Sequence, residues 1–513
     1  MSGPSGAWVL HDDLVAAARS WPDRCGVRDA SGSSTWAELL AASEHVASRL
    51  LLAGLAPGDR VAVVMRAGRL PVAALYGTSS AGLCIVVLDP HAPVERLVAL
   101  LDHCGASAVV CDEGTASSVR QAAARAGRDV VVLLLRDDAL TDRPATVELL
   151  ARRPLGVDLA ALVYTSGSTG RSRAAVFLHR NLEATVALVQ ASLPVTAADR
   201  VLSTLPLSHT YGLYQVLLAV RTGATLDLRS ALLVGDLLRV LREQQTTVLP
   251  GVPALWHALL GDAGSGTHPS VRVVTNAGAA LPPALGARLR TAFPAAEVFA
   301  MYGQTECGRA CVLPADRFAT HPDAVGFPLP GTDGWLVDQD GREPPDGEVG
   351  ELHVRGEHVM QGYWRDAPAT TAKLVPGRWP GDRVLRTGDL FRRDAAGHLC
   401  FVARRDDMIT TSGEKVAPLE VERVLASADG VGEAAVLGVL DARRGQRVVA
   451  HVAPRAGAVL DPEALRRHCR VHLEPSKVPT QVTVHDHLPH LSNGKVDRVA
   501  LSASAAGAGT GAA

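Results

Sequence analysis

Short apolar runs alternate with longer segments of helical periodicity through the first 300 residues of the chain. The runs that predict buried strands are residues 60–65, 84–88, 108–111, 130–134, 159–164, 201–205, 247–250, 271–275 and 298–302. A strand followed by a helix and then by another strand favours a parallel sheet with helices on both faces. The sequence therefore predicts an α/β fold with doubly wound sheets, and 513 residues are enough for two to four domains.

The pattern changes twice in the second half of the chain. From about residue 324, alternating runs bounded by glycines predict a β-rich subdomain over residues 324–404. Residues 405–501 predict a small α+β domain, and residues 502–513, mostly alanine, glycine and serine, are typical of a disordered tail. We thus expect an N-terminal domain of residues 1–404, a C-terminal domain of residues 405–501 and a short tail.

Composition and charge argue against several classes of protein. The net charge of −2 gives no indication of a nucleic-acid surface. The sequence has neither a recognisable signal peptide nor an apolar run of 18 residues, so we expect no stable membrane insertion and a cytoplasmic location. The eight cysteines lack the spacing of metal ligands, which fits free thiols in a reducing compartment.

A loop rich in glycine and hydroxyl groups follows the predicted strand at residues 159–164. Its members are Thr165, Ser166, Gly167, Ser168, Thr169 and Gly170. Glycine lets backbone N–H groups turn toward an anion, hydroxyl groups add donors, and Arg173 adds positive charge. The loop is a candidate phosphate cradle, although it lacks the Gly-Lys-Ser/Thr ending of a P-loop. A flexible surface linker has a similar composition.

Three other stretches carry candidate ligand-binding residues. Glu306, just after the strand at 298–302, is suited to Mg²⁺ beside phosphates, and with Thr305 it also fits a helix start. Asp389 is suited to the two hydroxyl groups of a ribose, and it also fits a turn. The chain has 47 arginines and four lysines, which favours a specific role for the ammonium group of Lys495 over a solvated surface position.

Together with residues 401–422, these stretches resemble, in order and spacing, the motifs of the AMP-forming adenylate superfamily. That superfamily includes acyl- and aryl-CoA ligases, luciferases and the adenylation domains of peptide synthetases. The resemblance covers roughly residues 10–500. It implies a large N-terminal domain of two α/β lobes plus a β subdomain, and a small mobile C-terminal domain. It also implies two half-reactions: a carboxylate attacks the α-phosphate of ATP to give acyl-AMP and pyrophosphate, and a thiol then attacks the acyl carbon.

The resemblance implies a role for each matching residue. The loop from Thr165 to Gly170, with Arg173, matches the segment that holds the β- and γ-phosphates. Tyr302 matches the ring that stacks on adenine, Thr305 the hydroxyl group that meets the α-phosphate, and Glu306 the Mg²⁺ ligand. Further nucleotide contacts are expected at Gly278, Ala279, Ala280, Met301, Gly303, Gln304 and Phe401.

The remaining matches lie toward the C-terminus. Asp389 matches the ribose-binding aspartate, Arg404 an arginine that reaches ribose or phosphate, and Asp406 the hinge of the small domain. Lys495 matches the lysine that bridges the carboxylate and the α-phosphate. The positions that depart from the usual pattern are Ser172, Arg173, Ala174, Ala403 and Thr410. We expect these departures to affect loop dynamics or rate rather than the chemistry.

The resemblance places the acid among residues that are mostly small or apolar, with His209 as a further catalytic residue. The expected acid-binding residues are His209, Tyr211, Gly212, Asn276, Ala277, Gly278, Gly303 and Ala310. Residues 209–211 contain no aspartate to pair with the ammonium group of an α-amino acid, and an unpaired buried ammonium is unfavourable. We therefore expect a fatty, aryl or related acid. Asp227 keeps open a β-amino or aminoaryl acid, and it also fits an exposed turn.

The expected acceptor is a thiol, either of CoA or of the phosphopantetheine arm of a stand-alone carrier protein. Relatives that use an amine acceptor, or that activate another oxyanion such as nitrite, remain alternatives, as does an inactive scaffold. The expected ligands are thus ATP, Mg²⁺, a small carboxylic acid and CoA or a carrier protein, without nucleic acid. The sequence is compatible with a monomer or a homodimer.

Overall fold

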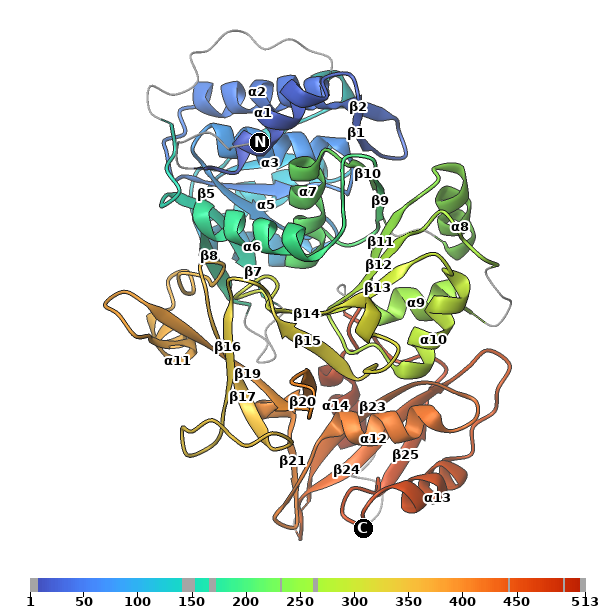
Figure 1. Ribbon diagram of the computed structural model, residues 1–513. Helices are drawn as coiled ribbons and strands as arrows, with labels where there is room; N and C mark the ends of the chain where they lie inside the picture. Colours follow the sequence, from blue (N-terminus) through green and yellow to red (C-terminus); the bar gives the residue numbers. More distant parts are fainter. Residues whose placement is uncertain are drawn as a thin grey trace.

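The computed structural model describes residues 8–140, 153–165, 172–230, 233–261, 266–441, 443–491 and 494–507. Two α/β lobes form the upper part of the molecule in Figure 1, and a smaller α+β unit, coloured orange to red, lies below them. No helix in the described part of the chain is both long enough and apolar enough to cross a membrane.

The first lobe is built on a six-stranded sheet in the order β6-β5-β3-β4-β7-β8. Its strands are β3 (Arg60–Val64), β4 (Cys84–Val87), β5 (Ala106–Cys111), β6 (Val131–Leu134), β7 (Leu159–Tyr164) and β8 (Ala174–Leu178). All pairs are parallel except β7 with β8, which form an antiparallel pair. The candidate phosphate loop therefore connects two neighbouring strands of one hairpin, a pairing that the sequence did not predict.

Helices surround this sheet and contact the second lobe. They are α1 (His11–Ser20), α2 (Trp36–Leu52), α3 (Arg69–Ser80), α4 (Val94–Cys104), α5 (Ala116–Arg125) and α6 (His179–Ser192), with a short 3₁₀ turn η1 (Asp137–Leu140). Helix α2 begins with a capping box, in which Thr35 and Glu38 satisfy each other's backbone N–H groups. Trp36, the first residue of this helix, is fully buried in the largest apolar cluster of the chain.

The second lobe carries a parallel sheet in the order β13-β12-β11-β9-β10-β1, with β2 antiparallel at its edge. The strands are β1 (Cys25–Arg28), β2 (Ser33–Thr35), β9 (Arg200–Ser203), β10 (Thr225–Leu228), β11 (Val248–Gly251), β12 (Val273–Asn276) and β13 (Glu297–Tyr302). Its helices are α7 (Thr210–Thr222), α8 (Val234–Glu243), α9 (Pro253–Leu259) and α10 (Pro283–Ala292). The parallel strands place residues 203–209, 276–280 and 302–306 at one edge, which is where open α/β sheets bind ligands.

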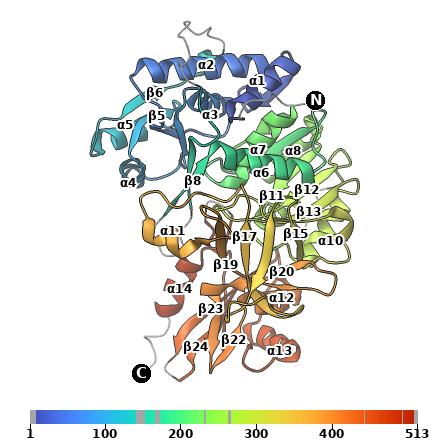
Figure 2. The same ribbon diagram turned by 60° about the vertical axis from the view of Figure 1, so that its left-hand side comes forward.

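The β-rich region continues this second sheet rather than forming a separate one. Strand β13 pairs with β14 (Cys311–Leu313), and the antiparallel series then includes β15 (Ala324–Pro328), β16 (Asp333–Val337), β17 (Val349–Arg355), β18 (Leu374–Pro376), β19 (Arg383–Arg393) and β20 (Leu399–Arg404). The 3₁₀ turn η2 (Ala315–Arg317) and helix α11 (Ala367–Lys373) lie between its strands. Figure 2, turned by 60°, shows β17 and β19 between the upper lobes and the small unit.

The small unit has its own sheet and its own core. The 3₁₀ turn η3 (Arg405–Asp407) leads into β21 (Ile409–Thr411), β22 (Glu414–Val416), α12 (Pro418–Ser427), β23 (Val431–Asp441), β24 (Gly445–Pro454), α13 (Pro462–His472), β25 (Gln481–Val484) and α14 (Arg498–Gly507). The apolar side chains of α12, including Val421 and Leu425, are buried against Val436 and Val448 of the sheet.

The predicted disordered tail needs a correction. Its first residues, 502–507, form the end of α14, since alanine is the strongest helix former and continues the helix that starts at Arg498. Residues 508–513 lie outside the described part of the chain.

Candidate active site

Asp389 is the point at which three separate stretches of the sequence meet. Its carboxylate accepts hydrogen bonds from the Tyr302 hydroxyl at 2.7 Å, from Gln304 Nε2 at 2.6 Å and from Arg404 Nε at 2.9 Å. Strand pairing places Asp389 on β19 directly opposite Arg404 on β20, whereas Tyr302 ends β13. A carboxylate offers about four lone-pair positions, so Asp389 retains capacity for a further donor such as a ribose hydroxyl.

Glu306 lies after β13 on the side of the β-rich region. One of its oxygens accepts a hydrogen bond of 2.5 Å from the hydroxyl group of Tyr363, and its carbonyl accepts one from the Met360 backbone. The carboxylate is half-buried and keeps further lone pairs. A hard oxygen donor in this position fits Mg²⁺, which takes one or two carboxylates together with phosphate oxygens and water.

Lys495 reaches the same group of residues from the small unit. Although the side chain is exposed to solvent, the surrounding protein desolvates its ammonium group and lowers the pKa, and the positive charge of Arg404 adds to this effect. Asp389 and Glu306 act on it in the opposite direction. The cation therefore lies within electrostatic range of both carboxylates, although it is more than 100 residues away in sequence.

The candidate phosphate loop is only partly covered by the structure. The Thr165 backbone N–H donates to the carbonyl of Arg173 at 2.7 Å, so the two ends of the loop are joined. The Arg173 guanidinium lies 3.4 Å from Asp366 and over the ring of Tyr363, the residue that binds Glu306. The remaining predicted members, Ser166, Gly167, Ser168, Thr169 and Gly170, lie outside the described residues.

The other predicted nucleotide contacts border the end of the parallel sheet. Gly278 and Ala279 are exposed just beyond β12, with Gly278 at φ +87°, and Ala280 follows them. Phe401 stacks edge-on against Phe391, which in turn contacts the ring of Tyr302. Phe401 is thus linked to Tyr302 through Phe391, and residues 278–280 follow β12, the strand that pairs with β13.

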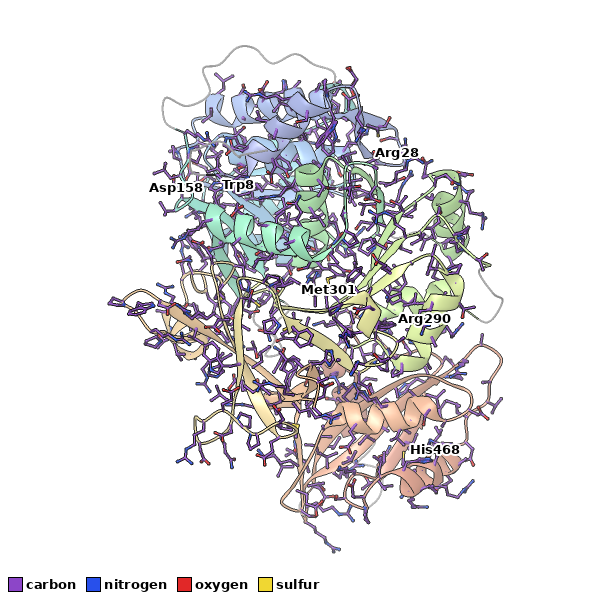
Figure 3. The ribbon with its side chains drawn as sticks, in the orientation of Figure 1. Trp8, Arg28, Asp158, Arg290, Met301 and His468 are labelled. Carbon is purple, nitrogen blue, oxygen red and sulfur yellow. The ribbon has the colours of Figure 1, made fainter. Side chains whose placement is uncertain are left out.

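Met301, Gly303 and Thr305 continue this border along the chain. Met301 is buried on β13 and is labelled near the middle of the molecule in Figure 3. A Cβ atom on Gly303 would lie 2.0 Å from the carbonyl oxygen of Gly308, so this turn requires glycine. Thr305 is half-buried directly before Glu306.

The predicted acid-binding residues also gather at this edge of the sheet. His209 caps the N-terminus of α7, and burial lowers the pKa of its imidazole, which favours the neutral form. The Tyr211 hydroxyl donates to the carbonyl of Thr275 at 2.9 Å, which attaches α7 to the end of β12. A Cβ atom on Gly212 would lie 2.2 Å from a backbone oxygen of Pro206, so only glycine fits there.

Asn276 closes the same region from β12. Its side chain accepts a hydrogen bond from the Trp256 indole at 2.9 Å and donates to the carbonyl of Ala279 at 3.1 Å, which shapes the turn through Ala277 and Gly278. Ala310 is fully buried, and its N–H donates to the carbonyl of Tyr302.

Both of our expectations for Asp227 need correction. Asp227 is neither an exposed turn residue nor a free partner for an amine: it is buried on β10, and Arg229 binds both of its oxygens at 2.5 and 3.2 Å. Residues two apart in an extended chain lie on the same face, which is why this pair forms.

The predicted hinge residue, Asp406, is exposed and lies in η3 between the β-rich region and the small unit.

Sequence analysis missed four residues of the site. They are Tyr363, which binds Glu306; Lys373, which donates to the Thr387 carbonyl; Glu351, which accepts from the N–H of Gly388; and Arg309. Tyr363 and Glu351 lie far from the motifs in sequence, so no local signal identifies them, whereas the scarcity of lysine was a weak indication for Lys373. Arg309 follows Glu306 closely, between Gly308 and the predicted Ala310, where two nearby glycines indicated a tightly folded segment.

Comparison with known proteins agrees with this geometry. Residues 14–364 match the family model for AMP-binding enzymes, and residues 420–495 match that for the C-terminal domain of AMP-binding enzymes. The chain is 32% identical over 498 residues to a sulfoacetate–CoA ligase of Cupriavidus necator, covering 95% of this chain and 96% of that protein. It is 33% identical over 489 residues to a feruloyl-CoA synthase of an Amycolatopsis species, covering 94% and 96%.

Solved structures give the same result. A benzoate CoA ligase from Burkholderia xenovorans superposes with a TM-score of 0.87 at 27% identity, covering 96% of this chain and all of that one. The chain belongs to the AMP-binding enzyme family, the AMP-forming adenylate superfamily that the motifs resemble. Within that superfamily it is an ATP-dependent, AMP-forming ligase of the acyl-CoA synthetase type.

Proposed function

We propose that this enzyme adenylates a carboxylic acid at the edge of the second sheet and transfers the acyl group to the thiol of CoA. The observation that carries the proposal is the position of Lys495, which the small unit brings within electrostatic range of Asp389 and Glu306. As the acid attacks the α-phosphate, negative charge accumulates on phosphorus and its oxygens. An ammonium group that is already positioned there stabilises the negative charge of the transition state more strongly than the negative charge of the ground state.

Each residue then has a defined task. Asp389 accepts the ribose hydroxyl groups, Tyr302 and residues 278–280 border the adenine, and Arg404 approaches ribose or phosphate. The loop of residues 165–170 with Arg173 holds the β- and γ-phosphates, and Thr305 donates to the α-phosphate. Mg²⁺, when bound, neutralises phosphate charge, and Glu306 is positioned to hold it while Tyr363 orients the carboxylate. His209, whose lowered pKa favours the neutral imidazole, interacts electrostatically with Lys495 and contacts the acid.

CoA is the proposed acceptor because the relatives described above carry names of CoA ligases and synthases. The phosphopantetheine arm of a carrier protein ends in the same thiol and is the second acceptor to test. We propose that residues 1–404 and 405–501 form the two domains, that the small domain rotates about Asp406 between the two half-reactions, and that the enzyme acts as a monomer or homodimer. ATP and CoA as substrates, and eight cysteines that are all free, support the cytoplasm as its location.

The proposal is tested by ATP–pyrophosphate exchange over a panel of fatty, aryl and short polar acids, with thioester formation measured in parallel. We expect acid-dependent exchange and a CoA thioester for the same acids. A reaction without acid measures background, and a holo carrier protein replaces CoA in a third series. Exchange with no acid in the panel would overturn the proposed adenylation, whereas exchange without a thioester to either thiol would overturn the proposed acceptor.

A further inference from the structure

Arg309 is a buried cation for which the described part of the chain supplies no anionic partner. Only 7% of its surface is exposed, and no carboxylate among the described residues forms an ion pair with it. Its Nε atom is fully buried and has no hydrogen-bond acceptor within reach in the described structure. The comparably buried Arg69, at 8% exposure, instead binds Asp29 at 3.1 Å and the hydroxyl groups of two serines.

The guanidinium group of Arg309 lies beside the predicted acid-binding residues. It sits over the ring of Tyr211, 4.6 Å from the ring centroid, and it is electrostatically coupled to Tyr214 one turn further along α7. Tyr211 is bound to Thr275 at the end of β12, the strand that leads into Asn276 and Gly278. Arg309 therefore lies against Tyr211, one of the predicted acid-binding residues, at the ligand edge of the sheet.

The local backbone holds Arg309 in this position. Gly308 adopts φ +62°, and a Cβ atom there would meet Thr185 at 2.8 Å. Gly303 passes so close to the Gly308 carbonyl that it tolerates no side chain either. The segment after Glu306 is thereby folded back onto β13, where the N–H of Ala310 donates to the Tyr302 carbonyl. The inward position of Arg309 is a consequence of this fold-back rather than of a flexible side chain.

The energetics indicate that a ligand completes this site. Arginine keeps its charge in proteins, and burying an ion without a partner costs several kcal/mol by general estimates. A cation–π contact such as that with Tyr211 returns about 2 kcal/mol at a desolvated position. The contact with the ring alone therefore does not offset the free-energy cost of burying the charge. An oxygen-rich anion that accepts hydrogen bonds from the forked N–H groups does offset it.

We propose that Arg309 determines specificity by binding a second anionic group on the acid, so that the substrates are acids carrying an additional carboxylate or sulfonate. This inference rests on the proposed function, because it assumes that the acid lies at this edge of the sheet. The reacting carboxylate points toward Lys495, and the second anionic group extends toward α7, where Arg309 pairs with it. Fatty acids and unsubstituted aryl acids leave the guanidinium unpaired and are poor substrates.

The test compares acids of similar size that differ in one charged group: succinate with butyrate, isophthalate with benzoate, and sulfoacetate with propionate. The measured quantity is the ratio of kcat/KM for the charged and the neutral member in ATP–pyrophosphate exchange. For at least one pair we expect the wild-type enzyme to favour the charged member by about 100-fold or more, the size expected when a buried ion pair is at stake. We expect Arg309→Met to lower that ratio by a similar factor.

Two further variants make the result decisive. Arg309→Lys keeps the charge but loses the forked geometry, so the ratio should fall by roughly tenfold, and this variant decides the question if Arg309→Met does not fold. Arg221→Met is the matched control: Arg221 belongs to α7, the helix against which Arg309 packs, but it is bound to Glu183 at 3.1 Å, and the ratio should keep its wild-type value.

The outcomes separate this inference from the proposed function. Exchange that favours the neutral member of every pair, or a ratio that Arg309→Met and Arg309→Lys leave unchanged, would overturn the inference while adenylation stands. A wild-type enzyme that supports exchange with no acid of either kind would overturn the proposed function itself.

Discussion

Replacement of Lys495 by alanine should slow the first half-reaction selectively. In the structure this ammonium group is the cation that the small unit adds to a site holding Asp389, Glu306 and Arg404. Arg404 already donates to Asp389 at 2.9 Å, so its charge is partly committed. Loss of one preorganised donor to a developing oxyanion typically costs about 2–4 kcal/mol. At 1.36 kcal/mol per factor of ten, this corresponds to a roughly 30- to 1,000-fold slower adenylation.

The assay separates the two half-reactions. Adenylation is measured as ATP–pyrophosphate exchange, and thioester formation is measured with synthetic acyl-AMP and CoA as substrates. In the second assay the variant should remain within about threefold of the wild-type rate. Lys477→Ala is the matched control, because Lys477 lies in the same unit but is bound to Glu420 at 2.8 Å and Glu474 at 2.9 Å. Adenylation by Lys495→Ala within threefold of the wild-type rate, or an equal loss in both half-reactions, would refute the reasoning.

Three other perturbations follow from the same geometry. Asp389→Asn removes the charge that accepts three donors, so KM for ATP should rise about tenfold in exchange assays, and an unchanged KM would contradict the ribose assignment. Because burial lowers the pKa of Lys495, its ammonium loses its proton at a lower pH than an ordinary lysine. The rate of adenylation should therefore fall as pH rises through that pKa. Lys495→Arg, which stays protonated, should not show this fall in rate. A fall at the same pH in Lys495→Arg would argue against Lys495 as the titrating group. Gly494 has φ +78°, and a Cβ atom there would lie 3.0 Å from Val252, so Gly494→Ala should slow adenylation roughly tenfold and spare thioester formation from acyl-AMP. Equal slowing of both steps would show that the effect is on folding.

Local patterns predicted much of the fold because apolar periodicity depends on neighbouring residues. The helix expected at residues 94–104 is α4, and the strand expected at 159–164 is β7, with the same bounds. Strand β8 was missed because its short apolar run suits a strand or a helix equally well, and only its pairing with β7 decides between them. The apolar periodicity of residues 214–220 predicts a helix there, but α7 begins earlier, at Thr210, and His209 is therefore its N-cap residue.

Residues of the candidate site could be predicted where they lie in short sequence motifs, but not where their partners are distant in the sequence. Glu306 follows the end of β13 and Asp389 lies within β19 of the same continuous sheet, so sheet topology brings them together. Tyr363, in contrast, reaches Glu306 across 57 residues, and its backbone is positioned by pairing with β8 of the first lobe. The burial of Arg309 depends on helix α7, almost 100 residues earlier, and local sequence does not report such packing.

The contacts between the small unit and the lobes also bear on how both half-reactions can share one site. Arg423 of α12 pairs with Asp323 at 3.1 Å, but both side chains are about a third or more exposed, and such pairs contribute roughly 0–1 kcal/mol. By contrast, Arg405, at the start of η3, is bound at 2.6 Å to the buried carboxylate of Glu351, which also accepts from the N–H of Gly388 beside Asp389. The residue before Asp406 is thus fixed to the strand that carries Asp389, whereas the ion pair between α12 and the β-rich region is exposed and weak. A rotation about Asp406 would therefore leave the nucleotide residues in place and remove Lys495 from the site, which is the change that a second, thiol-dependent half-reaction requires.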